Sequence, residues 1–408
     1  MRLDPDGKVH YDGHTVFRLY PRSTTQLEFL YSLEDNDTAG YDFWIEPSYV
    51  DRFVDVSVAP EEKRHFVQEL QERNISSEVL IEDVQAEIHN STTGFNDTPD
   101  LRYSRSFFND YQRLSTIHNY LEGLTIRRKE LATVVNIGKS FEGKELRVLK
   151  LSTGSAKMSV WLDGGMHARE WISPATVTYI LEELVGGYGN DNDTTKILDT
   201  FDIYGLPVAN PDGYEHTHKY NRLWRKTRST TSSYFCRGAD PNRNFGYQWY
   251  TGGSSNRPCS EIYAGSKAFS EPETKAISNF IYARRKEMLA YVTFHSYSQL
   301  WLTPWGFTPT LPKTYRELER VARIATEALK QVHGTQYTVG TSTNLLYVAS
   351  GGSDDWAHGE AHIPFSYTVE LRDKGRYGFM LPREQIIPTG EETWAGIKAM
   401  LLELVNKV

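Results

Sequence analysis

The sequence predicts two domains of different fold class, a small α+β domain followed by a large α/β domain. With 408 residues, the chain is longer than one typical domain. Residues 1–90 contain short, closely spaced strand and helix patterns, whereas residues 107–408 alternate apolar strand-like runs with longer helical stretches. Residues 91–106 between them are polar and carry Gly and Pro. We therefore expect a connector between two separately packed domains.

The small domain, residues 1–90, is predicted to follow the order β-α-β-β-α-β. Val54, Val56 and Val58 alternate with polar residues, as in a strand with one buried face. Pro60 stands where the first turn of a helix tolerates proline. The predicted elements are a strand over 14–20, a helix over 24–35, strands over 41–45 and 54–58, a helix over 61–73 and a strand over 77–82. This order is the split βαβ arrangement of ferredoxin-like domains.

The connector, residues 91–106, contains Arg102 and Arg105, where a trypsin-like protease has access if the segment is exposed. Taken alone, the segment fits two interpretations. It is either an ordinary interdomain linker or a segment whose cleavage activates the protein. Its composition does not distinguish them.

The large domain, residues 107–408, is predicted to form one sheet covered by helices. Its strand-like runs include SVWLDGG, DIYGLPVANPDG, MLAYVTFHSYS and FSYTVELRD. Helical stretches such as ATVTYILEELVGGY and TYRELERVARIATEALKQV separate them. Ligand sites in such folds collect at strand ends, so we expect the functional residues there.

The bulk composition excludes two classes of function. The formal net charge is -8 and no basic stripe is present, which argues against a nucleic-acid partner. No apolar run is long enough to cross a bilayer, so we expect no membrane-spanning role. The composition is otherwise typical of globular proteins, with 39% hydrophobic and 24% charged residues.

The cysteines and the glycosylation sequons indicate whether the protein is secreted or stays inside the cell. Cys236 and Cys259 are the only two cysteines, and they fit either reduced thiols or a disulfide. We see no signal peptide in the polar segment MRLDPDGK that opens the chain. The sequons nevertheless favour a secreted glycoprotein, and they stand at Asn36, Asn74, Asn90, Asn96 and Asn192.

Three residues predict a catalytic zinc site. His167 and Glu170 lie three apart in GGMHAREW, directly after a predicted strand, and His295 ends the run MLAYVTF. Two imidazoles and one carboxylate, with a fourth position open for water, form a common catalytic zinc set. Each residue alone also fits a simpler role, a surface His and a solvated Glu, or a hydrogen-bonded core His. Taken alone, the three residues leave these roles and the metal site open.

Other charged residues near predicted strand ends fit catalysis and substrate binding. Glu370 stands within an apolar strand, where a carboxylate is costly unless it is paired or functional. It is either a general base or an ion-pair partner of Arg372 or a nearby Lys. Arg225 and Arg243 carry the guanidinium geometry that holds a carboxylate through two hydrogen bonds, although solvated surface arginines are the simpler alternative.

Taken together, these motifs resemble the zinc metallocarboxypeptidases of the pancreatic A/B type, which are made as procarboxypeptidases. The resemblance covers nearly the whole chain, with residues 1–90 similar to the inhibitory pro-domain. The motifs that carry it are GGMHAREW, ANPDGYEHTH, NRLWRKTRS, DPNRNF, CSEIYAG, FHSYSQ, LYVASGGSDDW and FSYTVELRDKGRYGFMLP. All eight motifs occur in the order in which this family has them, which makes the resemblance very specific.

The resemblance implies a secreted, monomeric zymogen with one Zn²⁺, an α/β catalytic domain with a mixed central sheet, and activation by a trypsin-like protease at Arg102 or Arg105. His167, Glu170 and His295 would bind the zinc, Glu370 would be the general base and Arg225 would polarise the scissile carbonyl. The substrate would be a peptide or protein with a free C-terminus. The remaining implied roles are a clamp on the terminal carboxylate by Asn242, Arg243 and Tyr347, subsites lined by Arg169, Tyr297 and Phe379, orientation of His167 by Asp240, and a Cys236–Cys259 disulfide.

Asp354, in LYVASGGSDDW, predicts which terminal residue is removed. Relatives that prefer apolar ends carry an aliphatic residue at this position, and relatives that prefer Lys or Arg carry Asp. A buried carboxylate attracts a cationic side chain, and the small Gly306 and Ser342 leave room for a long one. We therefore expect a B-type preference. The alternatives are an A-type or broad preference, a non-catalytic binding protein on the same fold, and a relative of bacterial cell-wall amidases.

Overall fold

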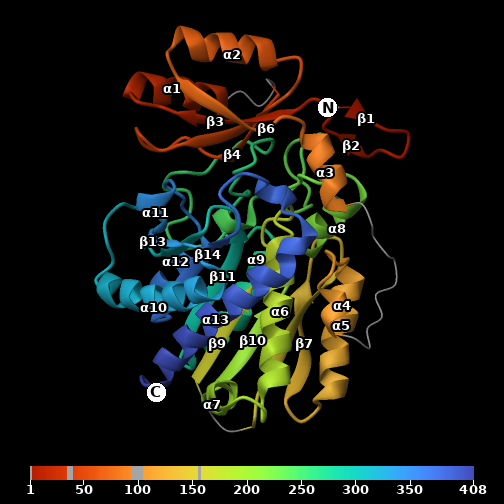
Figure 1. Cartoon of the computed structure of the whole chain (residues 1–408), viewed down its shortest axis with the longest axis vertical. Coiled ribbons are helices and arrows are strands. Elements are labelled where there is room, and N and C mark those ends of the chain that lie inside the picture. The colour runs from red at the N-terminus through yellow and green to blue at the C-terminus, as the bar shows by residue number, and fades with distance from the viewer. Residues whose placement is uncertain (1, 35–39, 93–103, 155–157) are drawn as a thin grey trace.

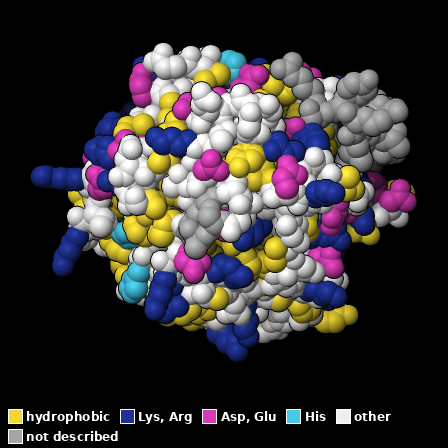
Figure 2. Space-filling view, turned by 90° about the horizontal axis from the view of Figure 1, so that it is seen from below, with side chains coloured by type: hydrophobic (Ala, Val, Ile, Leu, Met, Phe, Trp, Pro, Cys, Tyr) yellow, Lys and Arg dark blue, Asp and Glu magenta, His cyan; other side chains and the backbone are white. Residues whose placement is uncertain are grey.

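The computed structural model describes residues 2–34, 40–92, 104–154 and 158–408. Two bodies are visible in Figure 1, a small N-terminal domain and a larger domain on which it sits. No helix among the described residues is long and apolar enough to cross a membrane. Figure 2 shows the end of the large domain away from the small one, where Lys and Arg side chains are interspersed with Asp and Glu.

The small domain has the predicted β-α-β-β-α-β order. Its antiparallel sheet runs in the order β4-β5-β3-β6. Both helices lie on the outer face of this sheet (Figure 1), where Leu30 and Phe66 pack against the strands. The elements are β3 (Thr15–Tyr20), α1 (Thr24–Glu34), β4 (Tyr41–Ile45), β5 (Val54–Val58), α2 (Lys63–Glu72) and β6 (Ser76–Ile81), and a two-stranded sheet of β1 (Arg2–Leu3) and β2 (Val9–His10) precedes them.

Strand β5 differs from the expected half-buried strand, because every one of its residues is buried. Val54, Val56 and Val58 face the helices, and Asp55 faces the large domain. The inner face of the sheet also packs Trp44 against Phe379 of the large domain. The alternation in the sequence is therefore real, but its polar side is covered by the second domain rather than by water.

The large domain is built on an eight-stranded mixed sheet, in the order β13-β12-β14-β11-β9-β10-β8-β7. The four central strands β14, β11, β9 and β10 are parallel. All nine residues of β11 are buried, which explains its near-continuous apolar sequence. The strands are β7 (Ala132–Lys139), β8 (Glu145–Leu151), β9 (Met158–Asp163), β10 (Phe201–Leu206), β11 (Met288–Ser296), β12 (Leu300–Thr303), β13 (Thr338–Thr341) and β14 (Phe365–Leu371).

Helices cover both faces of this sheet. One face carries the larger apolar core, with α5 (Leu114–Arg127), α6 (Ile172–Gly187), α7 (Asn192–Thr200), α10 (Tyr315–His333) and α13 (Ile386–Val405). The other face carries a second core with α9 (Pro272–Arg284) and α12 (Ser353–Gly359). Shorter helices are α3 (Val84–Thr92), α4 (Ser104–Phe107), α8 (Pro211–Lys219) and α11 (Ser342–Leu345). The α/β architecture predicted for residues 107–408 is confirmed.

Candidate metal centre

The turn between β9 and α6 carries two of the three predicted metal ligands. After Asp163 the chain turns through Gly164 and Gly165, and His167 and Glu170 follow before the helix begins. Only glycine fits at Gly164, because a Cβ there would lie 2.8 Å from the Ser173 carbonyl oxygen. Ser173 also fixes the turn, since its hydroxyl donates to the Glu170 carbonyl at 2.9 Å.

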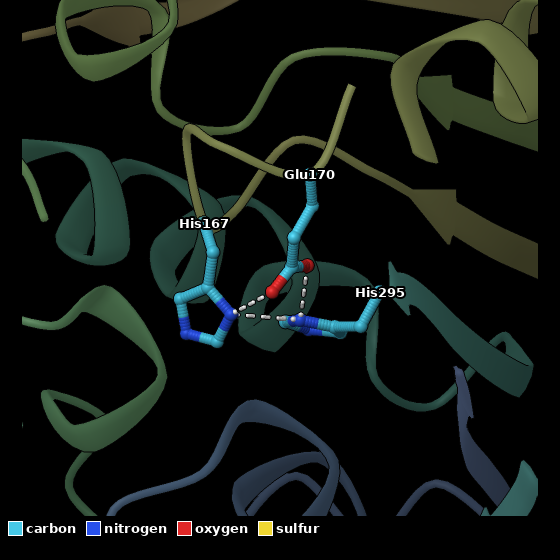
Figure 3. A group of neighbouring side chains, drawn as sticks. All are labelled: His167, Glu170 and His295. Carbon is cyan, nitrogen blue, oxygen red and sulfur yellow. Dashed lines mark hydrogen bonds and ion pairs between the residues drawn. The ribbon is translucent and has the colours of Figure 1, made fainter. Parts of the chain in front are cut away.

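The third ligand, His295, lies near the carboxyl end of β11 and points at the first two (Figure 3). Nδ1 of His167 lies 2.8 Å from Glu170 Oε1 and 3.1 Å from His295 Nδ1. His295 Nδ1 is in turn 3.1 Å from Glu170 Oε2. Ligand atoms about 2.0–2.1 Å from a tetrahedral zinc are spaced at about 3.3 Å, so these atoms fit one ion with little movement.

Burial and electrostatics favour a cation between these side chains. His167, Glu170 and His295 are only 4%, 2% and 1% exposed. Burial alone would lower the pKa of His295, but the neighbouring Glu170 carboxylate raises it to about 9. The centre of the cluster therefore favours positive charge, which a divalent ion supplies. Within the described ranges, no other group of three or more His, Cys, Asp or Glu is placed to hold a metal.

Asp240 links the metal ligands to a second cationic group. Its Oδ1 lies 3.0 Å from Nε2 of His167, the ring nitrogen turned away from the metal position. Its Oδ2 accepts from Nε and Nη2 of Arg225 at 3.1 and 2.7 Å. Asp240 is fully buried, and although burial opposes it, Arg225 and then His167 hold its pKa well below the usual range. The carboxylate is therefore ionised and fixes both partners.

Glu370 lies beside the metal ligands on the neighbouring strand. It pairs with His295 in the register between β14 and β11. The described part of the chain gives its carboxylate neither a hydrogen bond nor an ion pair, and Arg372 instead donates from Nε to Glu392 at 2.8 Å. Burial, opposed by His295, raises the pKa of Glu370 to about 8. The ion-pair alternative raised by the sequence is wrong.

Arg243 is a buried cation with spare hydrogen-bonding capacity. It lies at the end of a 3-10 helix (Pro241–Arg243) and is 2% exposed. Its Nε donates to the Gly253 carbonyl at 2.8 Å, whereas Nη2 makes no hydrogen bond with the described residues. The ring of Tyr347 lies 5.6 Å from its guanidinium carbon. Asn242, the preceding residue, accepts from the Ser353 backbone at 2.9 Å through Oδ1.

Comparison with known proteins assigns these features to a family. Residues 117–396 match the model of the family described as zinc carboxypeptidase, and residues 17–91 match that of the carboxypeptidase activation peptide. The chain belongs to the zinc carboxypeptidase family. It is a zymogen of a zinc-dependent metallocarboxypeptidase, with the three ligands described above forming the zinc site. The predicted family and cofactor are confirmed.

The similar proteins include both a carboxypeptidase B and a carboxypeptidase A. A carboxypeptidase B of Astacus astacus is 49% identical over 292 residues, covering 71% of this chain and 95% of the relative. A carboxypeptidase A2 of Mus musculus is 40% identical over 391 residues, 95% of this chain and 93% of the relative. The crystal structure of thrombin activatable fibrinolysis inhibitor matches with a TM-score of 0.89 at 35% identity, covering 98% of this chain and 100% of the other.

The activation-peptide domain of this carboxypeptidase places three carboxylates on residues expected to bind substrate. Asp42 accepts from Arg169 Nη1 at 3.1 Å. Glu46 Oε1 lies 3.5 Å from Nη2 of Arg243. Asp55 accepts from the Tyr297 hydroxyl at 2.7 Å. Sequence reasoning missed all three acids, although the alternation VDVSV, with an acid on the second face of a strand, was a signal for Asp55.

The subsite residue Phe379 is also covered by this domain. Trp44 packs on it with the ring centroids 5.0 Å apart. Arg169 stacks over the same ring, with its guanidinium carbon 4.3 Å from the centroid. The small domain therefore contacts both the charged and the aromatic groups of the expected substrate cleft.

The cysteines form a disulfide, whereas the expected cleavage sites are described only in part. The Cys236–Cys259 disulfide has an S–S length of 1.98 Å and spans 23 residues. Arg102 lies outside the described residues, and Arg105 lies in α4 by its backbone.

Asp354 lies at the start of α12 and is 5% exposed. The hydroxyl of Ser342 lies 3.5 Å from Asp354 Oδ2. Burial raises its pKa. No Lys or Arg in the described part of the chain forms an ion pair with it. The adjacent Asp355 has a different role, since it accepts from the backbone nitrogens of Gly306 and Phe307 at 2.9 and 3.0 Å.

Proposed function

We propose that the activated enzyme removes C-terminal Lys or Arg from peptides and proteins. One observation carries the proposal, which is that Asp354 is a buried carboxylate without a cationic partner among the described residues. A carboxylate is costly to bury unless a cation pairs with it. The side chain of a C-terminal Lys or Arg of the substrate would supply that cation. Ser342, which lies beside Asp354, and Gly306, which borders Ser342, are small enough to admit a long side chain.

Arg243 and its neighbours explain why cleavage occurs at the chain end. Once Glu46 leaves with the small domain, Nη2 of this buried cation can donate to a terminal carboxylate, and a guanidinium holds both carboxylate oxygens at once. Asn242 and Tyr347 flank the same guanidinium and complete the clamp. A substrate without a free C-terminus leaves Nη2 of this buried cation without an acceptor, so internal peptide bonds are disfavoured.

Glu370 and Arg225 provide the chemistry on the substrate. When bound, zinc polarises the scissile carbonyl and makes water a stronger acid. Glu370, with its unpaired carboxylate beside His295, takes the proton of the attacking water and transfers it to the leaving amine. Arg225 uses Nε and Nη2 for Asp240, which leaves Nη1 to donate to the oxygen that becomes negative. Asp240 thereby holds Arg225 and His167 in one fixed arrangement.

Latency follows from occupation of the same groups. Residues 1–90 form the inhibitory domain, residues 91–106 the activation segment and residues 107–408 the catalytic domain. Asp42, Glu46 and Asp55 hold Arg169, Arg243 and Tyr297, and Trp44 covers Phe379, so a substrate must displace the small domain. A trypsin-like protease that cuts after Arg102 or Arg105 releases it. We further propose that the protein is a secreted monomer.

A comparison of three substrates tests the proposed preference. The full chain is treated with trypsin and its kcat/KM is measured for peptides that differ only in a terminal Arg, Phe or Glu. We expect the Arg peptide to be fastest and the Glu peptide slowest, because a second carboxylate would meet Asp354. If the Phe peptide is hydrolysed fastest, the preference is A-type and the assignment of Asp354 is wrong.

A further inference from the structure

Asp163 is a buried carboxylate directly behind the metal ligand His295, and the mechanism above does not use it. It ends β9 and is fully buried. Its cross-strand neighbour in the register of β9 and β11 is Thr293, two residues before His295. Residues two apart on a strand share one face, so Asp163, Thr293 and His295 form a row on the same side of the sheet.

Three neutral groups donate to this carboxylate. Trp161 Nε1 and the Tyr291 hydroxyl lie 2.6 and 2.9 Å from Oδ2, and the Thr293 hydroxyl lies 2.6 Å from Oδ1. The described residues provide no Lys or Arg ion pair for Asp163. The three donors therefore occupy both oxygens of the buried carboxylate and fix the direction of each hydrogen bond.

The hydrogen-bond directions determine which nitrogen of His295 carries its proton. The Thr293 hydroxyl donates to Asp163 Oδ1, so its single proton points at this carboxylate. The lone pairs of the Thr293 oxygen remain free, and His295 Nε2 lies 3.3 Å from this oxygen. A hydrogen bond between the two therefore requires that Nε2 donates. The lone pair of His295 is then on Nδ1, the atom that faces Glu170 and His167.

We propose that Thr293 and Asp163 are positioning residues that hold His295 in the tautomer and ring orientation that bind zinc through Nδ1. His167 receives the same support directly, because its Nε2 contacts Asp240 at 3.0 Å. His295 receives it through one intervening hydroxyl. Partners of this kind beyond the ligands themselves contribute about 10- to 100-fold to metal affinity.

Substitutions at Thr293 separate the hydroxyl from its methyl group. Thr293→Val keeps the shape and removes the hydroxyl. Thr293→Ser keeps the hydroxyl and loses the methyl group, and Thr293→Ala loses both. The zinc dissociation constant of the uncleaved full chain is measured by competition with a chelator of known affinity, so no catalytic activity is required. The unfolding temperature of each zinc-free variant serves as the control for folding.

We expect Thr293→Val and Thr293→Ala to weaken zinc binding by about 10-fold or more, and Thr293→Ser to remain within about threefold of the wild type. Asp163→Asn, which removes the charge that orients the hydroxyl, should weaken binding in the same direction. Because the Ala and Ser variants both lack the methyl group and differ only in the hydroxyl, their comparison tests the hydroxyl even if the Val variant folds poorly. Equal zinc affinity of the Ala and Ser variants would overturn the proposal, and so would wild-type affinity in Thr293→Val.

Discussion

The contact between Glu46 and Arg243 gives the sharpest prediction about latency. The two side chains are 12% and 2% exposed, and Oε1 lies 3.5 Å from Nη2. At an effective dielectric constant of about 20, unit charges this close attract by about 4 to 5 kcal/mol. Desolvation offsets most of this attraction. A net loss of about 1.4 kcal/mol on Glu46→Gln would shift the equilibrium between covered and uncovered cleft about tenfold.

We therefore expect uncleaved Glu46→Gln to hydrolyse a short peptide with a C-terminal Arg about tenfold faster than the uncleaved wild type. Glu28→Gln is the matched control, because Glu28 is an exposed residue on α1, the outer helix layer. After trypsin treatment all three proteins should have the same kcat/KM, since the small domain is then released. The reasoning fails if the uncleaved Glu46 variant is no more active than the control, or if the difference persists after cleavage.

Three further substitutions test other parts of the structure. Glu370→Gln should retain zinc and lose about 10²- to 10⁴-fold in kcat, the usual contribution of a general base; near-normal turnover would mean that another group takes the proton. Asp354→Asn should lower kcat/KM for a C-terminal Arg peptide by about 10²-fold, since breaking a buried ion pair costs about 3 kcal/mol, with little change for a Phe peptide, and an equal loss for both would indicate a folding defect. The double variant Cys236→Ser/Cys259→Ser should lose about 3 kcal/mol in the free energy of unfolding measured with urea, and unchanged stability would contradict a stabilising cross-link.

Local pattern and motif were enough to predict most of the architecture and the metal ligands. The period-two alternation around Val56 and the apolar run of β11 each specify a strand without knowledge of its neighbours. His167 and Glu170 could be paired because they share one turn. His295 could be added because strand ends gather at one edge of a parallel sheet.

What could not be predicted depends on contacts between distant segments. Asp55 meets Tyr297 across a separation of 242 residues, and nothing local to either residue indicates the partner. The register that sets Thr293 opposite Asp163 is likewise fixed only by strand order, which the sequence did not provide. Both cases involve buried polar groups whose partners are chosen by tertiary packing.

The central claim is that one zinc ion is shared by side chains from the turn after β9 and from the end of β11. The direct measurement is the zinc content of the purified full chain, for the wild type and for His295→Ala, with the unfolding temperature recorded beside it. We expect one zinc per wild-type chain and a large loss of zinc from a still folded His295→Ala. Full zinc content in that variant would contradict the claim, because the ion would then be held elsewhere.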